Sequence, residues 1–264
     1  MSRNFLSEIV ARKREEIAQR RAKANGLKER AAKARKNIAT HRLRAALQAT
    51  SPAIKIIAEF KRKSPSRGVI RVDLSPADAA AAYERGGASA ISVLTDEKFF
   101  DGSLDDLIAI QTQTQLPILR KDFLIDPFQI YESANAGADA VLLIAAILDD
   151  PLLTQMRMIA EDEVGLDALI EVHDSNELRR AQTAGAKLIG VNNRDLRNFE
   201  VSLTTSEHLI AKAPRDAIMV SESGLQTFEQ LRRLHELGFH GFLIGESLMQ
   251  AGDPEAALRE LIAG

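Results

Sequence analysis

Short apolar runs alternate with amphipathic stretches along most of the chain. Four segments share one form, a helix end, a glycine and then an apolar strand, at residues 86–95, 136–145, 184–193 and 237–246. The corresponding glycines recur at intervals of 50, 48 and 53 residues, and they are Gly87, Gly137, Gly185 and Gly238. Glycine at that place suits the left-handed backbone that ends a helix. The pattern therefore predicts an internal repeat of strands and helices.

Four further apolar runs lie between these segments, and they cover residues 55–61, 116–123, 167–173 and 216–223. Each of the eight runs is followed by a helix-like stretch, and several stretches begin with a capping residue and a proline. These capping pairs are Ser75-Pro76, Asp126-Pro127 and Asp253-Pro254. Eight strand–helix pairs in alternation predict parallel strands with right-handed crossovers.

Two α/β folds are compatible with parallel strands. An open doubly wound sheet usually carries a glycine-rich dinucleotide turn after its first strand, whereas here that strand leads into KRKSPSRG at 61–68. A closed barrel fits the number of strands, the period and a length of about 215 residues. We therefore predict a single (β/α)8 TIM barrel, with residues 48–264 as the catalytic barrel domain and residues 1–47 as a basic helical extension packed on it.

Composition narrows the class of protein. The 264 residues are 45% hydrophobic and 27% charged, which is typical of a folded chain. There is no cysteine, so disulfides, thiolate metal sites and cysteine nucleophiles are excluded. The N-terminus lacks the apolar core of a signal peptide, and no apolar run is long enough to span a membrane. We expect a cytoplasmic protein without a membrane partner.

Charge is distributed unevenly along the chain. Residues 1–47 hold fourteen Lys and Arg against four Glu, although the formal net charge of the whole chain is only −2. An RNA-binding arm would have this composition, but base-stacking aromatic residues are nearly absent from it. A solvated helix packed on the body is the favoured interpretation, and no nucleic-acid partner is predicted. The packing residues would be Leu6, Ile9, Ile17 and Leu43.

Polar side chains stand at the C-terminal ends of the predicted strands, where TIM barrels place their active sites. Glu59 and Lys61 lie two residues apart at the end of the first strand, hence on one face. Lys121 ends the third strand, Glu171 the fifth and Asn192 the sixth. A lysine among apolar walls has a lowered pKa, so we expect a usable acid near neutral pH.

Each of these residues also has an ordinary explanation. Lys61 is compatible with a surface lysine, and Arg194 with a loop salt bridge to Asp195. His173 shares a strand face with Glu171 and is either a ligand or a simply hydrogen-bonded side chain. The joint occurrence of such residues at equivalent ends of several repeats favours a reaction site.

Two loops are candidates for binding phosphate. Segments 221–228 and 243–249 both lead from a strand through a glycine into a helix start, where backbone N–H groups favour an anion. Barrels often bind phosphate after strands seven and eight, and Ser64 after the first strand would add a hydroxyl. The alternative is that these glycines only serve tight turns.

Several motifs resemble the indole-3-glycerol phosphate synthase family of tryptophan biosynthesis. They occur in order and fall at the predicted strand ends: AEFKRKSPSRG (58–68), SVLTDEKFFDGS (92–103), LPILRKDFLID (116–126), LIEVH (169–173), IGVNNRDL (189–196), VSESG (220–224) and FLIGESLM (242–249). The resemblance covers nearly everything from Ile54 to Met249, and a helical extension is also a feature of that family.

The resemblance implies a carbon–carbon lyase acting on 1-(2-carboxyphenylamino)-1-deoxyribulose 5-phosphate. Ring closure, loss of carbon dioxide and loss of water would give indole-3-glycerol phosphate. By similarity, Lys121 would protonate the carbonyl oxygen during ring closure. Glu171 and Lys61 would serve the dehydration, with Glu59 orienting them and Asn192 holding a substrate hydroxyl. The resemblance implies no metal and no cofactor.

The same resemblance implies the substrate-binding residues. Ser64, the Ser223-Gly224 turn and the amides of Gly245-Glu246 would hold the phosphate. Arg194 would face the anthranilate carboxylate. Phe100, Phe123, Leu142 and Leu196 would form the wall around the aromatic ring.

Some points stay open at this level. Either lysine could act in either proton transfer, and Asn193 competes with Asn192 for the substrate. Glu246 would repel a phosphate through its carboxylate, so only its backbone N–H is expected to face it. A sugar-phosphate isomerase barrel is the nearest rival, but it would not need two lysines. We expect a single activity, a phosphorylated small-molecule substrate, and a monomer or weak homo-oligomer.

Overall fold

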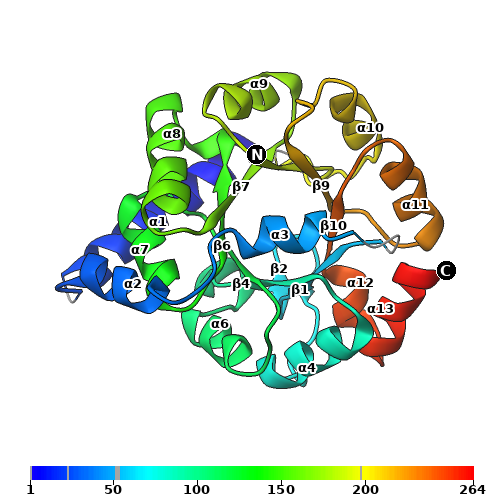
Figure 1. The fold of residues 1–264 in the computed structure, drawn as a ribbon, viewed down its shortest axis with the longest axis horizontal. Helices are drawn as coiled ribbons and strands as arrows, with labels where there is room; N and C mark the ends of the chain where they lie inside the picture. The colour runs from blue at the N-terminus through cyan, green and yellow to red at the C-terminus, as the bar shows by residue number, and fades with distance from the viewer. Residues whose placement is uncertain (1, 23, 51–53, 197) are drawn as a thin grey trace.

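A closed parallel barrel forms the body of the molecule (Figure 1). The computed structural model describes residues 2–22, 24–50, 54–196 and 198–264. Neighbouring strands follow the order β1-β10-β9-β8-β7-β6-β5-β4, and β1 pairs with both β4 and β10 to close the ring. The barrel strands are β1 (Ile56–Phe60), β4 (Ala90–Leu94), β5 (Ile118–Lys121), β6 (Ala140–Ile144), β7 (Asp167–Val172), β8 (Leu188–Asn192), β9 (Ile218–Glu222) and β10 (Gly241–Ile244). The predicted TIM barrel and its eight strands are confirmed.

Helices follow the strands and surround the barrel. They are α4 (Pro76–Gly86), α5 (Glu97–Phe100), α6 (Leu104–Gln111), α7 (Pro127–Asn135), η1 (Ala145–Ile147), α8 (Asp150–Met158), η2 (Ile159–Glu163), α9 (Ser175–Thr183), α10 (Thr204–Ile210), α11 (Phe228–Glu236), α12 (Glu246–Gln250) and α13 (Pro254–Ala263). The loop after β1 contains a small antiparallel pair, β2 (Lys63–Ser64) and β3 (Gly68–Val69). Across the described residues, no helix combines the length and the apolar character that crossing a membrane requires.

Local signals in the sequence set the helix boundaries. The Ser75 hydroxyl accepts a hydrogen bond from the backbone N–H of Asp78 at 3.1 Å, and Pro76 occupies the first turn of α4. Asp126 and Asp253 cap α7 and α13 in the same way. The four repeat glycines all have positive φ, between 81° and 113°. The predicted helix-ending role of these glycines is thereby confirmed.

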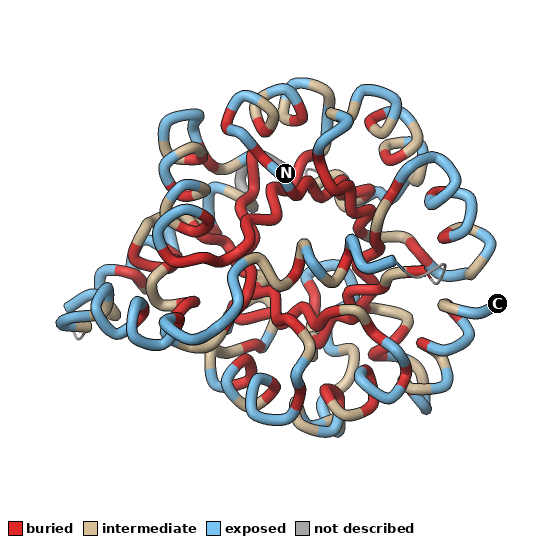
Figure 2. The backbone as a smooth tube through the Cα atoms, in the orientation of Figure 1, coloured by how far each residue is buried: buried red, intermediate tan, exposed pale blue. Residues whose placement is uncertain are grey.

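The two faces of each strand belong to different packing layers. Inward-pointing residues such as Leu119, Leu169 and Val220 fill the barrel interior. Their outward neighbours, such as Ile170 and Met219, pack against the surrounding helices. Figure 2 shows the resulting buried ring of strands. Because side chains alternate between faces, inward residues at the strand ends meet at one mouth of the barrel.

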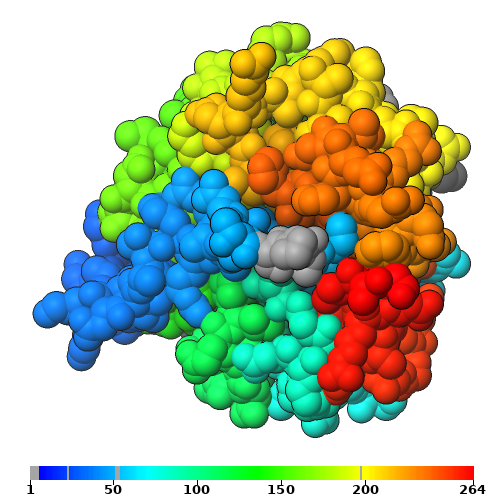
Figure 3. Space-filling model, turned by 45° about the vertical axis from the view of Figure 1, so that its right-hand side comes forward, coloured from blue at the N-terminus to red at the C-terminus, as the bar shows by residue number. Residues whose placement is uncertain are grey.

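The N-terminal extension reaches both ends of the barrel. It consists of α1 (Ser2–Arg21), α2 (Leu27–Arg35) and α3 (Arg42–Gln48). Ile9 of α1 and Leu43 and Leu47 of α3 are buried in the same apolar cluster as the inward strand residues. Helix α3 crosses the barrel centre in Figure 1, and α2 lies beside α7. The space-filling view shows the light-blue residues of α3 covering the centre of this face (Figure 3).

Acidic residues of the barrel pair with the basic side chains of the extension. Arg35 and Arg42 both contact Asp139, at 3.0 and 2.7 Å, and Asp139 is 2% exposed. Arg44 binds Asp167 at 2.5 Å. Further pairs join Arg20 to Glu97, Arg21 to Asp126 and Lys28 to Glu163. Several basic residues of the extension therefore serve its docking on the acidic barrel.

Candidate active site

A cavity of about 580 Å³ opens at the mouth formed by the C-terminal ends of the strands. Its lining contains every residue predicted for catalysis or substrate binding except Leu196. Leu196 lies instead beside a neighbouring cavity, together with Leu6 of the extension. The sequence-based site is thus brought together at one place, apart from this one wall residue.

Glu59 and Lys61 form the first charged pair of the mouth. Lys61 Nζ lies 2.5 Å from Glu59 Oε1, and the Glu59 side chain is 4% exposed. Space for the Glu59 carboxylate depends on Gly245 of the loop after β10, because a Cβ there would collide with it. The expected common orientation of Glu59 and Lys61 is therefore present.

Lys121 is held by two carboxylates from strands β7 and β9. Its Nζ lies 3.1 Å from Glu171 Oε2 and 3.3 Å from Glu222 Oε2. Burial acts to lower the pKa of Lys121, but Glu171, Glu222 and Glu59 together raise it above the ordinary lysine value. The expectation of a lowered lysine pKa is wrong, because acidic neighbours rather than apolar walls surround the ammonium group.

Glu222 is a site residue that the sequence-based selection missed, although it lies within the VSESG motif. It points inward at the end of β9 and is 1% exposed. Gly190 on the adjacent strand leaves room for its carboxylate. Burial raises the pKa of Glu222 to about 7; Lys121 opposes this shift, and Glu171 adds to it. Its position in the sequence could have indicated this role. Glu222 lies two residues after the inward-pointing Val220, just as Glu59 lies two residues after Ile57.

The two adjacent asparagines have different surroundings. Asn193 is 2% exposed; its side-chain NH₂ donates to Ser221 Oγ at 3.0 Å, and its oxygen accepts from the N–H of Ser206 at 3.1 Å. Asn192 lines the main cavity. Its oxygen accepts from the backbone N–H of Arg194 at 3.0 Å, and its NH₂ group donates to Glu171, so one amide hydrogen remains for a ligand.

His173 lies between two carboxylates rather than in a metal site. Its Nε2 is 3.3 Å from Glu171 Oε1, and its Nδ1 is 3.0 Å from Glu177 Oε2. The His173 ring borders the neighbouring cavity and does not line the main one. His173 therefore contacts Glu171, which lines the main cavity, but does not line that cavity itself.

The loops after β9 and β10 provide a polar end of the cavity. Ser223 and Gly224 both have positive φ, 68° and 77°, an unusual conformation for serine. Ser64 and Ser247 also line this end, and within the described residues the buried Ser247 hydroxyl has no hydrogen-bond partner. Backbone N–H groups and free hydroxyls of this kind suit an anion such as phosphate.

The Glu246 carboxylate is engaged by two arginines. Arg67 Nε lies 2.9 Å from Glu246 Oε1, and Arg194 Nη2 lies 3.8 Å from Glu246 Oε2. Both arginines line the main cavity. Glu246 thus links the loops after β1, β8 and β10 across the mouth.

Aromatic and aliphatic side chains form the opposite wall. The rings of Phe100 and Phe123 have centroids 6.2 Å apart and are tilted by 41°. Leu142 and Ile144 of β6 continue this surface. A planar aromatic group fits such a wall.

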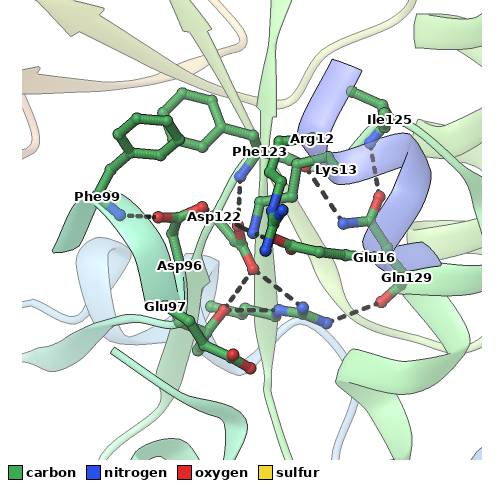
Figure 4. A network of polar contacts seen from close by, with 12 residues as sticks. Arg12, Lys13, Glu16, Asp96, Glu97, Phe99, Asp122, Phe123, Ile125 and Gln129 are labelled. Carbon is green, nitrogen blue, oxygen red and sulfur yellow. Dashed lines mark hydrogen bonds and ion pairs between the residues drawn. The ribbon is translucent and has the colours of Figure 1, made fainter. Parts of the chain in front are cut away.

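A second buried charge network lies behind this wall, under helix α1 (Figure 4). Lys13 Nζ is 2.8 Å from Asp96 Oδ2 and 2.9 Å from Asp122 Oδ1, and the Lys13 side chain is 2% exposed. Asp96 accepts the N–H of Phe99 and Asp122 accepts the N–H of Phe123. The network therefore ties the extension to the segments that carry the aromatic wall.

Comparisons with known proteins place the chain in a family. A family model described as indole-3-glycerol phosphate synthase matches residues 6–261. A protein of that name from Desulfosudis oleivorans is 49% identical over 207 residues, 78% of each chain. Another from Albidiferax ferrireducens is 46% identical over 264 residues, 98% of each chain.

Solved structures with low identity share the fold alone. A 3-hexulose-6-phosphate synthase from Salmonella typhimurium matches with a TM-score of 0.62 at 16% identity, covering 79% of this chain and 96% of that one. A thiamine phosphate pyrophosphorylase from Pyrococcus furiosus matches with a TM-score of 0.59 at 16% identity, covering 79% and 93%. These matches support the barrel architecture.

Proposed function

The chain belongs to the indole-3-glycerol phosphate synthase family, carboxy-lyases of tryptophan biosynthesis, and we propose that its barrel mouth performs that reaction with the residues described above. The substrate would be 1-(2-carboxyphenylamino)-1-deoxyribulose 5-phosphate and the product indole-3-glycerol phosphate. Residues 1–47 serve as the extension and residues 48–264 as the catalytic barrel. We expect this chemistry in the cytoplasm, carried out by a monomer or weak homo-oligomer.

Ring closure needs an acid at the ribulose carbonyl. The aromatic carbon that bears the carboxylate attacks the carbonyl carbon, and the carbonyl oxygen takes a proton. Lys121 is the donor, because its raised pKa keeps it charged at neutral pH and two carboxylates hold it in the mouth. A positioned cation stabilises the developing alkoxide before the proton moves.

Loss of carbon dioxide requires the carboxylate to leave a polar environment. Phe100, Phe123 and Leu142 enclose the aromatic ring, and Arg194 orients the carboxylate at the rim of the pocket. The electrons of the breaking carbon–carbon bond return to the ring system. An apolar wall favours this step because it solvates neutral carbon dioxide better than an anion.

Dehydration removes the hydroxyl that ring closure created. Lys61 is held by Glu59 and gives the proton with which the hydroxyl leaves as water. Glu171 takes the proton released when the five-membered ring becomes aromatic. Asn192 donates a hydrogen bond to a hydroxyl of the sugar chain, and Ser64, Ser223-Gly224 and Gly245-Glu246 hold the phosphate.

One observation carries this proposal: two lysines, one paired with a single carboxylate and the other held between two, face one cavity that ends in a polar loop region. A barrel that only isomerises a sugar phosphate has no need for both. The test is formation of indole-3-glycerol phosphate from the carboxyphenylamino substrate by wild type and by Lys121→Met. We expect turnover in wild type and a loss of about 10³-fold or more in the variant.

Lys187→Met is the matched control, because Lys187 is half exposed and, among the residues that the structure describes, pairs with Asp216 on the surface. This variant should turn over like wild type. No product from folded wild type would reject the reaction. Wild-type turnover in Lys121→Met would reject the role of Lys121.

A further inference from the structure

His173 holds a fixed place behind the proposed base Glu171. The backbone N–H of His173 donates to Glu177 Oε2 at 2.8 Å, and the ring Nδ1 contacts the same oxygen at 3.0 Å. Glu177 stands in the first turn of α9, whose cap is Asp174. The ring is thus clamped by the start of α9 and directs Nε2 toward Glu171 Oε1, 3.3 Å away.

Glu171 has a separate cation for each oxygen. Lys121 Nζ lies 3.1 Å from Oε2, and His173 Nε2 faces Oε1. The Glu171 side chain is 2% exposed, and these two contacts together with the hydrogen bond from Asn192 determine how its carboxylate is rotated. Oε1 is thus in ion-pair contact with His173, and Oε2 is the oxygen that faces Lys121.

Protonation of His173 follows from its acidic surroundings. Burial lowers the pKa of His173, but Glu171 and Glu177 outweigh this and raise it to about 10. The cavity that His173 borders is also lined by Asp174, Asp195 and Glu200, whereas α1 contributes only Leu6 and Ser7. The ring is therefore a cation with both nitrogens protonated at neutral pH.

We propose that His173 is a positioning residue for the reaction, an imidazolium that orients Glu171 from behind and leaves one carboxylate oxygen free to exchange a proton. His173 does not touch the substrate, since it borders the other cavity. The expected change in kcat rests on the proposed function. The ion pair between His173 and Glu171, by contrast, is present in the free protein.

The first test needs no substrate. NMR titration of the His173 ring in the free protein should give a pKa well above the ordinary histidine value, and Glu171→Gln should lower it by more than one unit. His240 is the internal control, because burial lowers its pKa and Glu171 is not among the causes. A His173 pKa below 7 in wild type, or one unmoved by Glu171→Gln, would overturn the proposal.

The second test separates positioning from stability. His173→Gln keeps a side chain of similar size without the charge, so kcat should fall about 10- to 100-fold while KM changes less than about threefold. In a plot of kcat against pH, the acid limb should move to higher pH. The reason is that Glu171 loses one of its cations, which raises the pKa of its carboxyl. The contribution of His173 to the alkaline limb near pH 10 should vanish, whereas loss of the lysine proton donors still limits kcat at alkaline pH.

Glu177→Gln is the companion variant, since it leaves the ring in place. In this variant the fall in kcat that comes from His173 should move from about pH 10 toward neutral pH, because Glu177 no longer raises the pKa of the ring. Wild-type kcat and an unchanged pH profile in His173→Gln would reject the proposal, as would a loss confined to thermal stability. If wild type makes no product, the proposed function fails, but the titration still decides the His173–Glu171 coupling.

Discussion

Two buried charge clusters lie on opposite sides of strand β5 and of the residue that follows it; all members of one line the substrate cavity, whereas only Asp122 of the other borders it. The mouth cluster consists of Glu59, Lys61, Lys121, Glu171 and Glu222. The anchor cluster consists of Lys13, Asp96, Arg120, Asp122 and Glu132. Lys121 and Asp122 are consecutive residues, so the alternation of side chains along the strand separates the two clusters.

Both clusters contain three carboxylates and two cations, but they differ in how these carboxylates are hydrogen-bonded. Asp96 and Asp122 accept backbone N–H groups, whereas neither oxygen of the buried Glu222 has a hydrogen-bond partner among the described residues. In the anchor cluster, burial acts to raise the pKa of Asp122, but Lys13 and Arg120 keep it below the ordinary value. Burial likewise acts to lower the pKa of Lys13, and Asp122 and Asp96 raise it instead. In the mouth cluster three carboxylates share two lysines, and the pKa of Glu222 rises to about 7. Burial, with Glu171 adding to it, thus raises the pKa of this carboxyl into the neutral range.

The comparison teaches that buried charge alone does not indicate a reaction site. A cluster whose buried carboxylates accept hydrogen bonds keeps them ionised and acts as a structural tie. A buried carboxylate without such hydrogen bonds, beside a cavity, is ready to change its protonation. Three variants test this distinction.

Lys13→Met should have the largest effect, on stability. It leaves Asp96 and Asp122 without their ammonium partner, so the free energy of unfolding should fall by about 3 to 5 kcal/mol in urea unfolding. The control is Arg12→Met on the same helix, because Arg12 is half exposed and pairs with Glu15 and Glu16. It should change stability by less than about 1 kcal/mol. Equal losses in both variants would contradict a buried tie at Lys13.

Glu222→Gln should remove a pH dependence near neutral pH. In wild type, ionisation of Glu222 as pH rises through about 7 adds a negative charge where an anionic substrate binds, so KM should rise. A single repulsion of about 1 kcal/mol corresponds to roughly fivefold in KM. The variant should lack this rise when measured in the same buffers from pH 6 to 8.5. If KM still rises with pH in Glu222→Gln, ionisation of the substrate phosphate or of another group causes the rise.

The stability of the free protein gives an independent check on Glu222. A pKa of about 7 in the folded state against 4.5 ordinarily means that the folded state binds the proton more tightly. This contribution is complete below pH 4.5 and is lost as pH rises through 7. The difference in the free energy of unfolding between wild type and Glu222→Gln should therefore change over this range. A constant difference would contradict the raised pKa.

Glu246→Gln should have the smallest effect. The pairs of Glu246 with Arg67 and Arg194 lie at the rim, where solvent screens them, and such pairs contribute about 0 to 1 kcal/mol. Releasing both arginines toward an anionic substrate should lower KM by at most about fivefold. Steady-state kinetics at low and high salt will check this, since the effect should shrink with salt. A tenfold or greater loss of kcat would instead place Glu246 in the chemistry.

The barrel could be predicted from the sequence because each repeat carries local signals for its own strand and helix. Apolar runs of strand length, a glycine before every second one, and proline-led caps are local signals that need no long-range information. The same reasoning found Glu59, Lys61, Lys121, Glu171 and Asn192, because the C-terminal ends of parallel strands meet at one edge. It missed Glu222, whose inward position is visible only when all strand ends are compared face by face.

The sequence by itself determined the fold, the place of the mouth and the kinds of side chain gathered there, since these depend on local periodicity and on residue type. Only the tertiary structure decided the protonation of those side chains. The raised pKa of Lys121, the pairing of Lys13 across more than eighty residues of chain and the contact of His173 with Glu171 depend on neighbours from separate strands and helices. Coulomb energy varies with distance in space, and separation along the chain does not report that distance.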